Sequence, residues 1–183
     1  MRYVKPLTAL LLASLTIVAN AATVVTFDDL IDYGTIPDGY GGAKTWNSTN
    51  LNYSPGYAIS GDFIAHSSAI DVSFASPIFF SGTYYNSWGG ARGGNSHELY
   101  FKGNLVFSAA EMANSSDQLY WLDSGYSGAV DRVVFYGSSD GAVIDNFTYS
   151  AAPVPEPETY GMLMAGLGLL GALALRRASR KNI

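Results

Sequence analysis

No helical hydrophobic period runs through residues 22–152, and this excludes most fold classes at once. The stretch consists of short apolar or alternating runs separated by Gly, Asn, Asp and Ser, which is the pattern of strands joined by tight turns. Nine such strands in about 130 residues predict an all-β domain, built as a jelly-roll-like antiparallel β-sandwich. The strands are expected at Val24–Phe27, Asp62–His66, Ile70–Phe74, Phe79–Tyr85, Glu98–Phe101, Leu105–Ser108, Leu119–Leu122, Val130–Tyr136 and Val143–Tyr149.

Two turns and the aromatic content support this fold class. Gly103 and Asn104 can supply the positive φ angles of a tight hairpin, and residues 138–141 predict a second hairpin that joins the last two strands. The chain has no cysteine, so no disulfide holds the domain together. All but two of the aromatic residues fall between residues 22 and 152, and they can fill a core in place of disulfides.

The N-terminus has the three parts of a secretory signal peptide. Arg2 and Lys5 precede the apolar run Leu7–Val18, and Ala19-Asn20-Ala21 forms a small-residue cleavage site. We therefore expect residues 1–21 to be removed after Ala21, and residues 22–152 to be the folded domain. The alternative is a buried N-terminal helix, which would not need these parts in this order.

The C-terminus, residues 153–183, has a proline motif, an apolar run and a basic tail. The motif is Val154-Pro155-Glu156-Pro157, and Thr159 after it can cap a helix by accepting a hydrogen bond from an early backbone N–H. The run Tyr160–Leu175 carries no charge and predicts a single hydrophobic transmembrane helix at the short end of the usual length. The basic residues after it, Arg176 and Arg177 first, predict a cytoplasmic C-terminus with the domain on the other side.

This tail resembles the PEP-CTERM protein-sorting signal, because the motif Val154–Pro157, Thr159, the apolar run and Arg176-Arg177 stand in that order at the C-terminus. The same kind of segment is catalogued as the C-terminal domain of ice-binding proteins, a name that describes the tail. The resemblance implies an exported protein of a Gram-negative bacterium that makes exopolysaccharide. It also implies a precursor anchored in the inner membrane, an exosortase that cleaves near the motif, and a final place at the cell surface or in the extracellular matrix. The alternative is an ordinary single-span anchor.

The domain itself is strongly acidic. Residues 22–152 hold thirteen of the fifteen acidic residues but only four basic ones, which gives a formal net charge of −9. Phosphate backbones repel such a surface, so we expect no nucleic-acid partner.

No catalytic residue is expected, so the protein is interpreted as a non-enzyme. Gly137-Ser138-Ser139-Asp140-Gly141 matches the G-x-S-x-G pattern, but a hydrolase elbow needs a helix after the turn and this sequence continues as a strand. A glycosidase needs two carboxylates on either side of the scissile bond, and Glu98 and Glu111 are the glutamates of the domain. A secreted glycan-active hydrolase therefore stays an alternative.

Four aspartates are candidates for a structural Ca²⁺ site, and no other cofactor is expected. Asp28, Asp29 and Asp32 follow the first expected strand, and Asp145 lies in the last. First and last strands are often neighbours in sandwiches, and carboxylate oxygens suit Ca²⁺. Turn and capping roles for the same residues are the alternative.

Aromatic residues near loops are the candidates for ligand binding. Tyr84, Tyr85, Trp88 and Arg92 belong to or flank a glycine-rich loop, and Trp46 with Tyr40 and Tyr53 forms a second cluster. Aromatic faces stack on sugar rings while amides and Arg bond the hydroxyls, so these residues predict polysaccharide binding; the alternative is that they pack the ends of the sandwich.

The middle of the chain also resembles ectodomains that PEP-CTERM proteins carry, at Phe27–Leu30, at Ile36–Gly42 with Trp46, and at Ile144–Phe147. This resemblance implies a lectin-like sandwich. The sequence thus predicts an exported cell-envelope or matrix protein that binds exopolysaccharide. The alternatives are the hydrolase and a purely structural matrix protein without a small ligand.

Overall fold

The structure is a computed structural model, which describes residues 21–31, 34–88, 95–110, 118–138, 140–152 and 157–179. Several residues with predicted roles lie outside these ranges. They are residues 1–20 of the expected signal peptide, Asp32, Arg92, Glu111, Ser139, Val154, Pro155 and Glu156.

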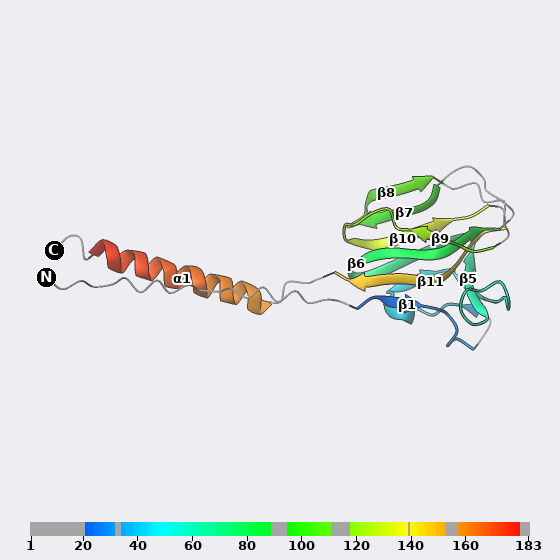
Figure 1. The fold of residues 1–183 in the computed structure, drawn as a ribbon, viewed down its shortest axis with the longest axis horizontal. Coiled ribbons are helices and arrows are strands. Elements are labelled where there is room, and N and C mark those ends of the chain that lie inside the picture. The colour runs from blue at the N-terminus through cyan, green and yellow to red at the C-terminus, as the bar shows by residue number, and fades with distance from the viewer. Residues whose placement is uncertain are drawn as a thin grey trace.

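Within the described ranges the chain forms antiparallel strands and one C-terminal helix, so the predicted all-β antiparallel class is confirmed (Figure 1). Every expected strand overlaps an observed one, and two of them are parts of one long strand, Ala69–Ser87. The short strands Gly34–Thr35, Thr45–Asn47 and Asn50–Tyr53 were not expected. The elements are β1 (Thr23–Val25), β2 (Gly34–Thr35), a 3-10 turn at Tyr40–Gly42, β3 (Thr45–Asn47), β4 (Asn50–Tyr53), β5 (Phe63–Ser67), β6 (Ala69–Ser87), β7 (Asn95–Phe101), β8 (Asn104–Ala110), β9 (Tyr120–Asp123), β10 (Val130–Tyr136), β11 (Ala142–Ala151) and α1 (Pro157–Ser179).

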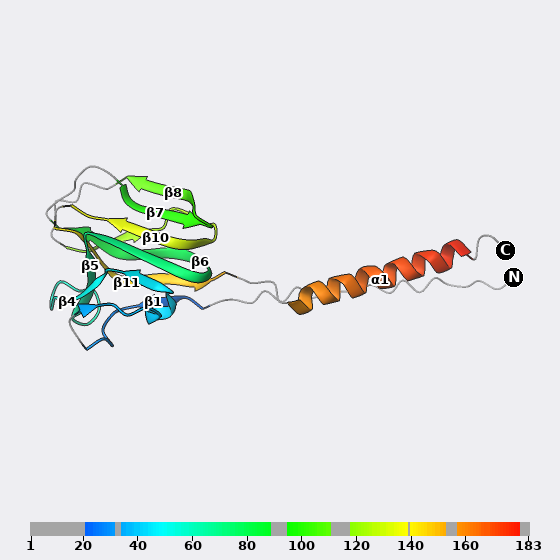
Figure 2. The same cartoon turned by 180° about the vertical axis from the view of Figure 1, so that it is seen from behind.

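The long strand β6 pairs with different neighbours along its two halves. Its first half pairs with β3 and β10, and its second half pairs with β9 and β11. Ile78 is the meeting point, because it pairs with both Val130 and Ala151. A first set of strands therefore comprises β3, β6, β10, β7 and β8, and a second set comprises β9, β6, β11, β5, β4 and β2 (Figure 2).

The core lies where the buried sides of the two sets meet. Phe135 of the first set packs against Phe80 and Tyr85 of the second, with ring centroids 5.9 and 6.3 Å apart. Trp46 packs edge-on against Phe147 at 5.8 Å. Alternation along each strand directs every second side chain into this core and the others outward. The jelly-roll-like sandwich stays a prediction.

Both expected turns are present, but in different forms from those predicted. In the β7–β8 hairpin the positive φ angles belong to Lys102 (51°) and Gly103 (78°), so Asn104 is already the first residue of β8. At the second turn the N–H of Gly141 donates to the carbonyl of Ser138 at 3.0 Å. The strands on either side, β10 and β11, each pair with β6 and not with one another, so the predicted pairing of these two strands is wrong.

The C-terminal helix α1 begins at Pro157, two residues before the predicted cap. Proline is favoured at the first helical position because its missing N–H would have no partner there. Thr159 therefore lies inside the first turn, and its predicted capping role is wrong. Among the residues whose structure is described, no helix combines the length and the hydropathy that a bilayer crossing requires. The expected apolar helix is thus confirmed, but its role as a transmembrane span is not supported.

The two ends of the domain are neighbours. β1 pairs with β11, with Thr23 opposite Tyr149. The first strand therefore begins and the last strand ends at the same end of the domain, and Figure 1 shows β1 and β11 side by side.

Candidate functional site: an aromatic face on the second set of strands

Five ring-bearing residues gather on the outward side of the second set. Strand alternation directs Tyr84 outward while its neighbours Thr83 and Tyr85 are buried. Tyr84 pairs with Trp121 of β9 on one side and with Asp145 of β11 on the other. Beneath them Ile64, Leu119 and Val143 form a small buried cluster, on which Tyr57, Ala58, Tyr84 and Trp88 pack. We call Tyr57, His66, Tyr84, Trp88 and Trp121 the aromatic face.

Trp88 is held at one end of the aromatic face by contacts on several sides. Its Nε1–H donates to the hydroxyl of Tyr57 at 2.9 Å, and its ring lies 4.8 Å from the ring of His66. Its backbone N–H donates to the carbonyl of Gly141 at 2.9 Å. The amide of Asn86 also donates to the Tyr57 hydroxyl, at 3.1 Å. These contacts leave the Trp88 side chain half-buried and its orientation well defined.

Trp121 is the exposed ring of the aromatic face, with 42% of its surface accessible. It meets Tyr84 edge-on, with centroids 5.3 Å apart and planes at 71°. One edge of the indole lies over Gly82, where a Cβ atom would stand 2.6 Å from its Cζ2. The missing side chain of Gly82 therefore lets the indole rest on the backbone, and the ring is fixed while much of its surface meets solvent.

The aromatic residues expected to bind ligand separate into two groups. Trp88 and Tyr84 lie on the aromatic face, whereas Tyr85 and Trp46 are buried in the core at 0% and 2% exposure. The Nε1–H of Trp46 donates to the carbonyl of Tyr40 at 2.9 Å, and the Tyr40 hydroxyl donates to Asp29. Burial, and next the carboxylate of Asp29, raise the pKa of Tyr40. Arg92 lies outside the described residues.

Sequence reasoning missed Tyr57, His66 and Trp121. Trp121 alternates with the buried Leu122 in β9, so its outward direction follows from the period of the strand. Tyr57 lies in the loop between β4 and β5, where no periodic pattern indicates which way a side chain points.

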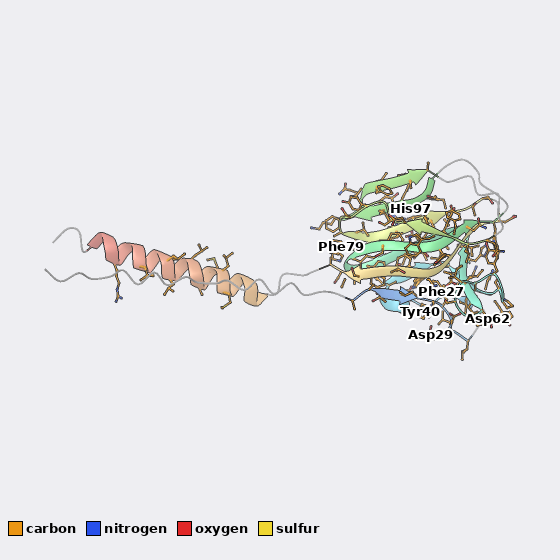
Figure 3. All side chains as sticks on the ribbon, in the orientation of Figure 1. Phe27, Asp29, Tyr40, Asp62, Phe79 and His97 are labelled. Atoms are coloured by element: carbon orange, nitrogen blue, oxygen red, sulfur yellow. The ribbon has the colours of Figure 1, made fainter. Side chains whose placement is uncertain are left out.

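Two of the predicted Ca²⁺ ligands do converge, but on N–H groups. Asp28 accepts hydrogen bonds from the backbone N–H groups of Asp62 and Phe63 at 3.1 and 3.2 Å. Asp145 accepts from those of Ile59 and Ser60, at 2.8 and 3.1 Å. These bonds tie down the loop between β4 and β5, and Figure 3 shows Asp62 and Asp29 at this end of the strands.

The surroundings of these carboxylates match the alternative turn and capping roles. Burial raises the pKa of Asp145, whose side chain is wholly enclosed. Donors that already face a carboxylate oxygen compete with a cation for it. Within the described residues no three His, Asp or Glu side chains are grouped as a metal site requires, and Asp32 lies outside them. The Ca²⁺ site stays a prediction.

The first set of strands carries a different, polar network on its outward side. Arg132 binds both carboxylate oxygens of Asp71, at 2.8 and 2.9 Å, and its guanidinium lies 4.9 Å from the centre of the Tyr100 ring. The hydroxyls of Tyr100 and Tyr136 donate to one oxygen of Glu98, at 2.5 and 2.7 Å. The hydrogen bond to Glu98 raises the pKa of Tyr100, while burial and then Glu98 raise that of Tyr136. Internal partners thus already engage the carboxylates of this face.

Two surface hollows bear on the hydrolase alternative. One of about 280 Å³ is lined by Asp29, Thr35 and apolar residues, and one of about 540 Å³ beside β9 is lined by Asp123, serines, Phe80 and Tyr126. A glycosidase needs two carboxylates facing one another across the substrate. Each of these hollows has a single carboxylate in its lining.

Comparisons with known proteins identify the tail. Searches among curated proteins and among solved structures found no match. Residues 153–180 match the family described as the PEP-CTERM protein-sorting motif. The matched range contains the Pro-Glu-Pro motif, the helix α1 and Arg176-Arg177. These are the features on which the resemblance to the sorting signal was based. The chain therefore carries a PEP-CTERM protein-sorting motif behind an antiparallel β-domain.

Proposed function

We propose that the β-domain binds polysaccharide through the aromatic face, at the cell envelope or in the extracellular matrix. The sorting motif supports an exported protein with a membrane-anchored precursor that an exosortase processes. The observation that carries the binding proposal is the Trp121 indole, which is 42% exposed and yet fixed against Tyr84 and Gly82.

A fixed, exposed aromatic ring suits a sugar ring because the C–H faces of pyranoses are apolar. Stacking on a ring that is already ordered loses little conformational freedom, and hydroxyls around the stacked sugar stay solvated. A purely structural role does not require an exposed indole held in one orientation. A hydrolase would in addition need a pair of carboxylates beside the ring.

Two matched variants test the proposal. Trp121→Ala removes the exposed ring, and Tyr53→Ala removes another exposed ring that also stands edge-on to a neighbour, Phe63, at 5.4 Å but outside the aromatic face. We expect Trp121→Ala to weaken binding to extracted exopolysaccharide by roughly tenfold, equivalent to about 1.4 kcal/mol, and Tyr53→Ala to leave it unchanged. Equal binding by the wild type and Trp121→Ala in pull-down and glycan-array measurements would rule out this surface.

A further inference from the structure

The basic residues of the domain that the structure describes are confined to the first set of strands, whereas acidic residues lie on both sets. Lys44 precedes β3, Lys102 lies at the β7–β8 turn and Arg132 lies in β10. Arg132 is moreover neutralised by Asp71. None of these three described cations stands on the aromatic face, and Arg92, four residues after Trp88, lies outside the described residues.

Two exposed acidic residues adjoin the aromatic face in the chain. Asp123 ends the strand that carries Trp121, and the exposed Asp140 is joined to His66, whose Nε2 is 2.7 Å from its carbonyl oxygen. The domain as a whole carries a formal charge of −9. A polymer with a carboxylate, sulfate or phosphate on each repeat would therefore approach a surface of its own sign.

We infer that the ligand of the aromatic face is an uncharged polysaccharide and that the charge of the face excludes acidic polymers. The inference rests on the proposed function, since it assigns the chemical class of the polymer bound there. Neutral sugars offer the apolar ring faces that Trp121 and Tyr84 can stack on, and they carry no charge to be repelled. For a polyuronate the same stacking is opposed by repulsion that acts over about 10 Å at 0.1 M salt and about 3 Å at 1 M.

The test uses the full chain in a non-ionic detergent on native affinity gels that contain a neutral β-glucan, polygalacturonate or chitosan. We expect the neutral glucan to retard the wild type and not Trp121→Ala. Polygalacturonate should not retard the protein at 0.1 M NaCl. At about 1 M NaCl, co-sedimentation should detect weak binding to polygalacturonate that depends on Trp121. Chitosan is positively charged and tests the effect of opposite charge. If chitosan also retards Trp121→Ala, its binding to the protein is non-specific.

A pair of charge reversals separates local from overall repulsion. Asp140→Lys and Asp38→Lys change the net charge equally, but Asp38 lies in the exposed turn before Tyr40, away from the aromatic face. Asp140→Lys should gain polygalacturonate binding at 0.1 M NaCl at least several-fold over Asp38→Lys, with glucan binding unchanged. Trp121-dependent binding of polygalacturonate by the wild type at 0.1 M NaCl would overturn the inference and leave the proposed function standing. If the wild type bound none of the three polymers at either salt concentration, both the inference and the proposed function would be wrong.

Discussion

The carboxylate of Asp145 in β11 accepts a hydrogen bond from the backbone N–H of Ser60, which lies 85 residues earlier in the chain, at 3.1 Å. The same oxygen accepts from the N–H of Ile59, and the hydroxyl of Ser60 donates to Asn146 at 2.7 Å. These bonds attach the loop between β4 and β5 to the second set of strands. Since that loop carries Tyr57, which accepts the hydrogen bond of Trp88, the buried carboxylate orders one end of the aromatic face.

Asp145→Ala should therefore destabilise the domain by about 2–4 kcal/mol, because the backbone N–H groups of Ile59 and Ser60 lose the buried carboxylate that accepts from them. Chemical denaturation followed by tryptophan fluorescence measures this difference. Asp140→Ala removes an exposed carboxylate five residues earlier and should change the free energy of unfolding by no more than about 0.5 kcal/mol. Equal stability of the two variants would show that the bonds to the loop contribute nothing net.

Gly82→Ala tests how Trp121 is positioned. The φ angle of Gly82 is 152°, and an added Cβ would stand 2.6 Å from the indole and 2.5 Å from the carbonyl oxygen of Leu122. We expect a loss of about 1–3 kcal/mol in stability, together with a shift in tryptophan emission and weaker glycan binding, because the ring must move. Gly103→Ala is the control, since it also has a positive φ but has no atom near the added Cβ. If glycan binding by Gly82→Ala were unchanged, the fixed orientation of the indole would not matter for the ligand.

The stability of the domain should fall as the pH drops below about 6.5, because of His97. Its side chain is 1% exposed, and burial lowers its pKa from 6.5. Between that lowered pKa and 6.5 the unfolded chain binds a proton that folded His97 does not, so the free energy of unfolding rises with pH in this window. The contribution is fully present above 6.5 and is lost as pH falls through the folded-state pKa.

Urea denaturation at a series of pH values measures this dependence, whose slope from one proton is at most about 1.4 kcal/mol per pH unit. His97→Gln should flatten it, whereas His66→Gln leaves His97 intact and should retain it. A His97→Gln variant with the wild-type slope would assign the effect to other groups.

Mass spectrometry of the protein made in its own host tests the processing of both ends. We expect a mature chain that begins at Ala22 and lacks Arg176 and Arg177, because the signal peptidase and the exosortase remove the two terminal segments. Replacing Pro155 and Glu156 by Ala should leave the C-terminal segment attached. Recovery of wild-type protein from the outer fraction with the Arg176–Arg177 tail still present would contradict exosortase processing.

The strand content was predictable because it depends on local patterns. Short, mostly apolar or β-branched and aromatic runs of five to seven residues, bounded by Gly, Asn, Asp or Ser, indicate β5, β7 and β10 whatever their partners are. β2, β3 and β4 are only two to four residues long and too short to show a period, so they form because neighbouring strands offer free edges. The pairing of β10 and β11 with β6 instead of with one another likewise depends on contacts far apart in the chain.

For the candidate site, residue type indicated that aromatic rings matter but not which rings reach solvent. Tyr84 and Tyr85 are adjacent in the sequence, and a single step along β6 turns one outward and buries the other. Trp46 looked equivalent to Trp88, yet its strand faces the core.

By itself the sequence determined the antiparallel class of the domain, its acidic charge and the sorting tail, because each follows from composition or from neighbouring residues. Only the tertiary structure decided that Tyr57, His66 and Trp121 join Tyr84 and Trp88 on one face. The physical reason is that strand register and the anchoring of a loop by Asp145 arise from contacts between residues tens of positions apart, which no local pattern encodes.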